Sequence, residues 1–123
     1  MSEKRQKVGL AGEDAARDYL LNKGYEILAT NYRCPLGEID IIARDNRTIV
    51  IVEVRTKTGY SFGGPEESIT AAKAKKLNRL AMYYLRTISC RDIPCRIDLV
   101  AVMLNRNNFL PQKINHIQGI LAG

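Results

Sequence analysis

The sequence predicts an α/β domain in which a mixed β-sheet is flanked by helices, and three observations support this fold class. The chain has 123 residues, the length of one domain, and a hydrophobic content of 46% that is sufficient for a core. Residues 36–44 and 48–57 are rich in Ile and Val, as is typical of strands covered on both faces. Residues 10–23 and 70–87 have the spacing of helices that bury one face.

The elements are expected in the order α-β-β-β-α-β-β. Residues 1–8 are polar and charged, so we expect a flexible, frayed end before a single domain that covers residues 9–123. Gly24 ends the first helix, because glycine often follows a helix, and Thr70 can cap the second. The remaining predicted elements are a strand at 25–33, a turn at 34–37, the two strands named above, a glycine-rich loop at 58–68, a break at 91–94, and strands at 95–104 and 112–118.

Composition narrows the class of protein further. The net charge of +6 favours an anionic partner, and nucleic acid is the first candidate. No run of apolar residues is long enough to span a membrane, and the N-terminal residues lack the apolar segment of a secretion signal. Three cysteines without a CxxC pair, together with the single His116, argue against a structural zinc site and predict a reducing cytoplasm.

Two acidic residues, Asp40 and Glu53, interrupt the apolar strands. A buried carboxylate without a partner is costly, so each needs an explanation. If the two strands form a hairpin in which Arg44 pairs with Arg47, Asp40 lies opposite Ile51 and Glu53 lies one diagonal step away on the same face. A three-residue loop would instead send the acids to opposite faces.

The favoured register divides the hairpin into a charged face and an apolar face. The charged face would carry Glu38, Asp40, Ile42, Ile51, Glu53, Arg55 and Lys57, and the apolar face Ile39, Ile41, Val50, Val52 and Val54.

Two carboxylates at this spacing repel each other unless a cation lies between them. Mg²⁺ takes oxygen ligands and keeps several waters, so a few carboxylates suffice to hold it. The positive charge of Arg55 or Lys57 could hold a scissile phosphate or orient a water. The alternative is structural: Asp40 and Glu53 would only form salt bridges with Arg55, Lys57 or Arg33.

The order of motifs along the chain carries a family resemblance. The segments GEDAARDYLLNKGYEIL, GEIDIIARD, IVEVRTK, FGGPEESIT, RIDLVAV and INHI follow one another between about residues 9 and 118. In these motifs the chain resembles the YraN-like family of small bacterial proteins. The resemblance implies a restriction-endonuclease-like fold of the PD-(D/E)xK superfamily, similar to that of archaeal Holliday-junction resolvases.

The resemblance also implies roles for individual residues. Asp40 matches the motif aspartate, Glu53 matches the motif glutamate, and Glu13 matches an acid that resolvase-like relatives place near the metal. These acids would hold Mg²⁺ or Mn²⁺. The usual motif lysine is Arg55 here, which cannot act as a base but can bind phosphate. Lys57 lies two residues further on the same face and could take the place of that lysine.

Other polar residues are weaker candidates. Glu38 shares the predicted face of Asp40 and could support it as a further acid. Lys73, Lys75 and Arg79 could contact the phosphates of a nucleic acid, although a solvated helix face explains them more simply. Glu13 also has an alternative to metal binding, because an acid in the first turn of a helix interacts favourably with the helix dipole.

Three further features have no assigned chemistry. Asp98 is an acid in a predicted buried strand, with no spacing argument behind it. His116 is expected to pack at a sheet edge rather than to ligate a metal. The loop at 58–68 lacks phosphate-loop spacing and could instead form a mobile flap over the site.

We therefore expect a nucleic-acid-binding protein, with DNA as its partner, that hydrolyses phosphodiester bonds with Mg²⁺ and has branched DNA among its candidate substrates. Two alternatives stay open. The same fold could bind nucleic acid without cutting it, which Arg55 at the lysine position favours. The acids could also be merely ion-paired in a structural or interaction protein. Junction resolvases tend to be two-fold dimers, so the resemblance also suggests a homodimer.

Overall fold

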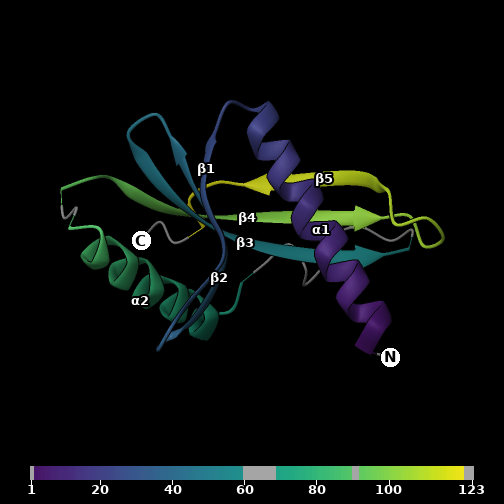
Figure 1. The fold of residues 1–123 in the computed structure, drawn as a ribbon, viewed down its shortest axis with the longest axis horizontal. Helices are drawn as coiled ribbons and strands as arrows, with labels where there is room; N and C mark the ends of the chain where they lie inside the picture. The colour runs from purple at the N-terminus through teal and green to yellow at the C-terminus, as the bar shows by residue number, and fades with distance from the viewer. Residues whose placement is uncertain (1, 60–68, 90–91, 121–123) are drawn as a thin grey trace.

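The computed structural model describes residues 2–59, 69–89 and 92–120, and these form a five-stranded sheet with one helix on each face (Figure 1). The elements are α1 (Ser2–Asn22), β1 (Glu26–Cys34), β2 (Gly37–Asp45), β3 (Thr48–Thr58), α2 (Ala71–Thr87), β4 (Cys95–Leu104) and β5 (Pro111–Ile117). The predicted fold class and order of elements are confirmed. The predicted flap falls on residues 60–68, which lie outside the described residues.

The strands lie side by side in the order of the sequence, from β1 to β5. β3 and β4 run parallel and the other neighbours run antiparallel, so the sheet is mixed. A parallel pair needs a crossover connection, and α2 lies between β3 and β4 in the chain. The side chain of Thr70 caps α2 as predicted, because it accepts a hydrogen bond from the backbone N–H of Lys73.

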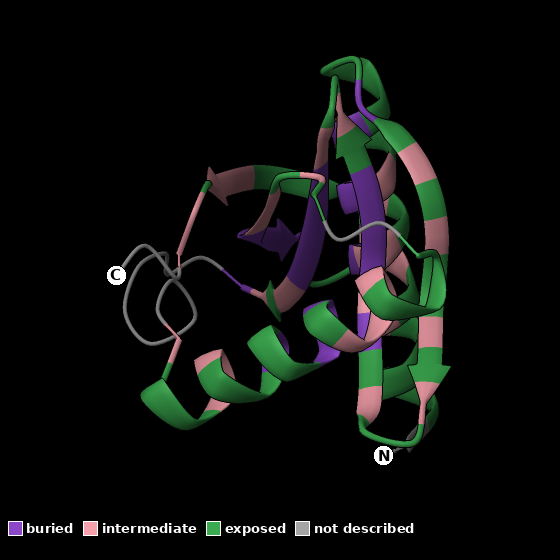
Figure 2. Ribbon diagram, turned by 90° about the vertical axis from the view of Figure 1, so that its left-hand side faces the viewer, coloured by how far each residue is buried: buried purple, intermediate pink, exposed green. Residues whose placement is uncertain are grey.

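The sheet has a hydrophobic core on each face, because its central strands are apolar on both sides. Figure 2 shows that much of these strands is buried. The core beneath α1 includes Ala16, Leu20, Ile41, Val50 and Val52. The core beneath α2 includes Leu77, Leu80, Ile39, Ile42, Ile49 and Ile51. The predicted division of the hairpin into one apolar and one charged face is therefore wrong, since a helix covers each face.

The β2–β3 hairpin also has a different register from the predicted one. Ile42, not Asp40, lies opposite Ile51. The reason is the turn: Asn46 adopts a left-handed φ of 57°, which asparagine tolerates and two-residue hairpin turns require, so β2 continues to Asp45.

The first helix begins earlier than the sequence predicts. α1 starts at Ser2, so the segment predicted to fray is the beginning of the helix. Residues 3–8 contain no glycine or proline and are mainly good helix formers, and Val8 packs against the core beneath α1. Of the helices that the structure describes, neither is long and apolar enough to cross a membrane.

Gly12 allows α1 to cross the sheet at close range. A Cβ atom on Gly12 would lie 1.9 Å from Oγ1 of Thr56 in β3, whereas a Cβ on Gly9, one turn earlier, would meet no atom within 4 Å. This contact fixes the first half of α1 against the C-terminal half of β3, which is where the candidate site lies.

The close crossing predicts opposite effects for two glycine substitutions in α1. We expect Gly12→Ala to lower the free energy of unfolding by about 2 kcal/mol, because the methyl group forces α1 away from Thr56. Gly9→Ala should raise it by up to about 1 kcal/mol, because alanine is the better helix former and the space is open. Urea denaturation of both variants measures this. Equal effects of the two substitutions would contradict the close approach at Gly12.

Candidate functional site

Asp40 lies where β2 departs from regular alternation. Ile39 packs in the core beneath α2 and Ile41 in the core beneath α1, although residues two apart in a regular strand share a face. The neighbouring strand is irregular at the same level, because Asn31 has a left-handed φ of 51°. The pairing of β2 with β3 ends at Ile41 and Val52, so Asp40, the next residue, is not paired with a residue of β3. The strands therefore leave Asp40 accessible from the α1 face.

The carboxylate of Asp40 is held by the backbone and surrounded by other charges. Its Oδ2 accepts a hydrogen bond of 2.8 Å from the backbone N–H of Val54. The pKa of Asp40 is raised from 3.8 to about 6, chiefly because burial disfavours the charged form. The Val54 hydrogen bond and Lys73 act to lower this pKa, whereas the negative charges of Glu53 and Glu13 raise it. A cation bound beside Asp40 would relieve this repulsion.

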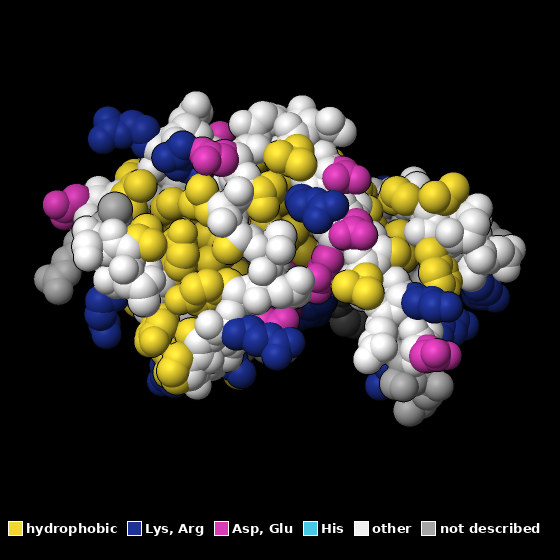
Figure 3. Space-filling view, viewed as in Figure 1, with side chains coloured by type: hydrophobic (Ala, Val, Ile, Leu, Met, Phe, Trp, Pro, Cys, Tyr) yellow, Lys and Arg dark blue, Asp and Glu magenta, His cyan; other side chains and the backbone are white. Residues whose placement is uncertain are grey.

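A cavity of about 570 Å³ opens beside the N-terminal half of α1. Its lining includes two acids, Glu13 and Asp40, and three basic residues, Lys4, Arg5 and Lys57. A band of acidic side chains crosses this face of the molecule, and basic side chains lie on both sides of it (Figure 3). The cavity therefore combines the oxygen ligands that a hard cation prefers with positive charge that suits an anion.

Glu53 lies on the other side of β3. Ile51 lies two residues earlier on β3, so it shares a face of the sheet with Glu53, and Ile51 belongs to the core beneath α2. Glu53 itself is only 8% exposed. Its Oε2 is 3.5 Å from Nζ of Lys73 on α2 and 3.4 Å from Nε of Arg55. The prediction that Asp40 and Glu53 share one face of the hairpin is therefore corrected. The irregularity of β2 turns Asp40 toward α1, while β3 keeps its alternation.

Glu13 joins Asp40 at the cavity, as the resemblance implies. Burial raises the pKa of Glu13, a hydrogen bond from the side chain of Asn31 lowers it, and the charge of Glu38 raises it. Glu38 itself is exposed and forms an ion pair of 3.6 Å with Arg33. Glu38 thus acts on Glu13 through its charge and lies outside the cavity lining.

The predicted basic residues separate into three groups. Lys57 lines the cavity, and Lys73 and Arg55 converge on Glu53. Lys75 and Arg79 are exposed on α2 and do not line the cavity. Of the three residues of α2 predicted to contact phosphates, Lys73, Lys75 and Arg79, only Lys73 lies close to an acid of the site.

The sequence reasoning missed two residues of the site, Lys4 and Arg5, because it treated residues 1–8 as a frayed end. The information that could have placed them is the unbroken helix propensity that runs up to Gly9. A helix that starts at Ser2 carries both basic side chains to the cavity.

The acids suit a divalent metal ion in their chemistry. Carboxylate oxygens are the preferred ligands of Mg²⁺ and Mn²⁺, and the pKa of Asp40 is raised chiefly by burial and further by the charges of Glu53 and Glu13. In the described part of the chain no three His, Cys, Asp or Glu side chains are grouped closely enough to hold a metal as they stand. Glu53 would have to leave Lys73 and Arg55 to join Asp40 and Glu13.

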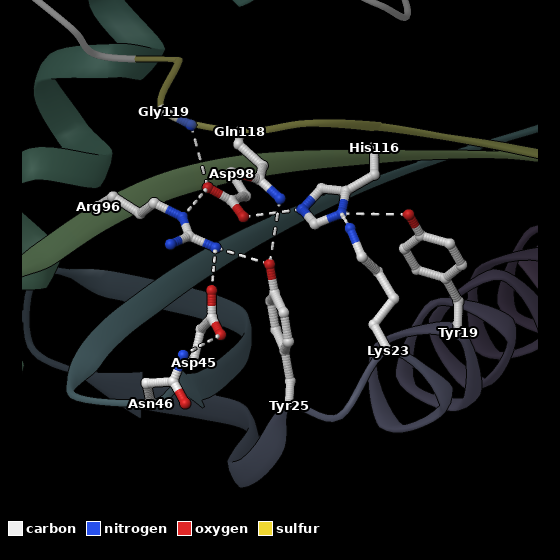
Figure 4. Close-up of polar contacts among 10 residues, drawn as sticks. All are labelled: Tyr19, Lys23, Tyr25, Asp45, Asn46, Arg96, Asp98, His116, Gln118 and Gly119. Atoms are coloured by element: carbon white, nitrogen blue, oxygen red, sulfur yellow. Dashed lines mark hydrogen bonds and ion pairs between the residues drawn. The ribbon is translucent and has the colours of Figure 1, made fainter.

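A second group of polar side chains lies beside the C-terminal end of α1 (Figure 4). Its centre is the fully buried Asp98, which accepts hydrogen bonds from Nε of Arg96 at 3.0 Å and from the backbone N–H of Gly119 at 3.1 Å. Nε2 of His116 lies 2.7 Å from the other carboxylate oxygen. Burial would raise the pKa of Asp98, but the hydrogen bonds, those from His116 and Arg96 first, lower it on balance.

The imidazole of His116 is enclosed in the same group. Nδ1 lies 3.3 Å from the hydroxyl of Tyr19 and 3.3 Å from Nζ of Lys23. Because the Lys23 ammonium can only donate, Nδ1 accepts and Nε2 carries the proton that is donated to Asp98. These groups satisfy one another, and none of them lines the cavity described above. We assign this group a structural role, which agrees with the expected packing role of His116.

The fold and the site define a class: a small α/β domain with a mixed five-stranded sheet and an acid-containing cavity beside its first helix. Residues 12–102 match the model of "Uncharacterised protein family UPF0102", and the chain belongs to this family. The YraN-like family predicted from the motifs is the same family, so that prediction is confirmed.

Relatives match over nearly the whole chain. A UPF0102 protein of Moorella thermoacetica is 48% identical over 86% of this chain and 88% of its own length. One from Thermodesulfovibrio yellowstonii is 44% identical over 93% of this chain and 95% of its own length. One from Desulfitobacterium hafniense is 44% identical over 98% of this chain and 100% of its own length.

The raised pKa of Asp40 predicts that its ionised carboxylate lowers the free energy of unfolding at neutral pH. The folded pKa of about 6 exceeds the ordinary value of 3.8, so the folded state binds more protons between these values and loses stability as pH rises through them. We expect Asp40→Asn to raise the free energy of unfolding by on the order of 1–3 kcal/mol at pH 7.5, and by almost nothing below pH ~4.

Denaturation curves across this pH range measure the effect of Asp40→Asn, with Asp18→Asn as the control because Asp18 is an exposed acid in α1. The control should change stability little at any pH. A loss of stability in Asp40→Asn at pH 7.5 would contradict an uncompensated carboxylate at this position.

Proposed function

We propose that the protein binds nucleic acid and hydrolyses its phosphodiester bonds with the help of a divalent metal ion. One observation carries this proposal: Asp40 is a half-buried carboxylate whose pKa is raised by partial burial and by two further acids, and it opens onto a cavity with basic residues in its wall. Acids of this kind collect at functional sites, because a structural ion pair would lower the pKa of the carboxylate.

Asp40 and Glu13, which share the cavity, would hold the metal ion, and Glu53 would join them by leaving Lys73 and Arg55. When bound, Mg²⁺ or Mn²⁺ would supply a Lewis acid for the phosphoryl oxygen and a water of lowered pKa. The chain's own residues would bind and orient the phosphate. Lys57 supplies positive charge at the cavity, where a phosphate could approach Asp40.

The resemblance to the PD-(D/E)xK superfamily supports the same chemistry. Asp40 on β2 and Glu53 on β3 occupy the positions of the motif acids. Arg55 occupies the position of the motif lysine and cannot serve as a base, because its guanidinium stays protonated. Lys73 brings a primary amine to Glu53 from α2, and its charge acts on Asp40 as well. We therefore propose that Lys73 and Arg55 share the cationic role.

This proposal predicts metal-dependent cleavage that Asp40→Asn abolishes. We expect the purified protein to cut labelled DNA in Mg²⁺ or Mn²⁺ and to lose activity in EDTA. Asp40→Asn should lower the rate by roughly 100-fold or more, because the metal's stabilisation of the transition state is worth several kcal/mol. Gel assays on linear duplex, single-stranded and four-way-junction DNA, and on RNA, measure the rate and the preferred substrate.

The stabilising effect expected of Asp40→Asn makes the assay interpretable, since lost activity cannot then be ascribed to unfolding. Asp18→Asn is again the matched control and should cleave at the wild-type rate. Cleavage that survives in Asp40→Asn, or that does not need a divalent ion, would contradict the proposal.

The second candidate function is a module that binds nucleic acid without cutting it. One observation favours it: Glu53 is already ion-paired with both Lys73 and Arg55. Wild-type protein that binds DNA tightly but neither cleaves it nor takes up Mn²⁺ in calorimetry would support this candidate over the first.

The proposed role of Lys73 predicts a difference between two lysines of α2. Lys73→Gln should lower the cleavage rate at least tenfold, because a cation next to Glu53 is lost. Lys75→Gln removes the same charge from an exposed position of the same helix and should stay within about twofold of wild type. Steady-state rates of the two variants measure this. Equal rates would show that Lys73 only pairs with Glu53.

A further inference from the structure

We infer that Lys4 and Arg5 bind the phosphate backbone of the nucleic-acid strand, next to the phosphate that lies at Asp40. The inference rests on the proposed function and extends it to a part of the chain that no motif covers. The two residues form, with Lys57, the basic part of the wall around the acids.

The fold holds the backbone of these two residues in place before a ligand arrives. Lys4 and Arg5 belong to a continuous helix that starts at Ser2, and the contact between Gly12 and Thr56 fixes that helix against β3. Side chains on a fixed helix lose less conformational freedom on binding than side chains on a loose terminus. The first turns of α1 are therefore a prearranged part of the cavity.

The charges of Lys4 and Arg5 have no ion-pair partner among the described residues. Their position is also unfavourable for the helix itself, because positive charge near an N-terminus opposes the helix dipole. Glu3 supplies the only acid of the first turn. Residues that are unfavourable for their own helix tend to occur at functional sites. Binding of an anion at the cavity would explain why both basic residues occur here.

The arrangement of charge favours a strand over a small anion. A single small anion in the cavity would meet the carboxylates of Glu13 and Asp40 as well as the basic residues. A phosphodiester strand carries regularly spaced charges, so one phosphate can lie at the acids with a bound metal while its neighbour lies on Lys4 and Arg5. Such contacts position the strand without reading its sequence.

The test compares two double variants that remove the same charge. Lys4→Gln/Arg5→Gln changes the cavity wall. Lys7→Gln/Arg47→Gln is the matched control, because Lys7 is exposed on the same helix, Arg47 is exposed in the β2–β3 turn, and neither lines the cavity. Binding is measured in EDTA and again in Ca²⁺, a hard cation that takes oxygen ligands, by fluorescence anisotropy with labelled single-stranded, duplex and four-way-junction DNA over a range of salt concentrations.

We expect Lys4→Gln/Arg5→Gln to weaken binding at least tenfold and to reduce the slope of log K against log salt by about two, because two phosphate contacts are lost. The control should lose less than threefold. Circular dichroism and thermal unfolding should show both variants folded, since replacing basic residues in the first turns does not weaken α1.

The outcomes separate this inference from the proposed function. Wild-type binding with equal losses in both double variants would overturn the role of Lys4 and Arg5 and leave the proposed function standing. Wild-type protein that binds none of the probes in either condition, or binds them with no dependence on salt, would overturn both.

Discussion

The partial burial of the Asp40 carboxylate is the constraint on which the rest of the site depends. The strands can hold it because β2 departs from alternation at this point and the backbone N–H of Val54 satisfies one oxygen. That single hydrogen bond does not offset burial and the charges of Glu53 and Glu13, so the pKa stays near 6. The fold thus keeps a carboxylate ionised at neutral pH at a cost, and a cation would remove much of that cost.

Two aspartates of the sheet, the fully buried Asp98 and the half-buried Asp40, show how surroundings decide between structure and function. Asp98 receives hydrogen bonds from His116, Arg96 and a backbone N–H, and its pKa is lowered. Asp40 receives one, and its pKa is raised. A group with several hydrogen bonds stabilises the packing of α1 on β4 and β5, whereas a carboxylate with one hydrogen bond beside a cavity remains available to a ligand. Two aspartates of one sheet therefore differ in role, because one has several hydrogen-bond donors around its carboxylate and the other has one.

The glycine in the middle of α1 connects the fold to the site. Gly12 lets the helix approach β3 closely, which sets Glu13 beside Asp40 and carries Lys4 and Arg5 to the cavity wall. On the other face, α2 brings Lys73 to Glu53. The acids on β2 and β3 are thereby reached from both helices, so each face of the sheet contributes a different part of the charge distribution.

The sequence by itself determined the order of the elements, the N-cap at Thr70 and the identity of the acids, because propensity, turn residues and apolar runs are local properties. It could not determine where those acids point. Side chains alternate with period two, so the irregularity at Asp40 was enough to separate it from Glu53 and join it to Glu13. Only the tertiary structure decided this, because the packing of two helices on opposite faces, and not local pattern, selects the side on which each carboxylate lies.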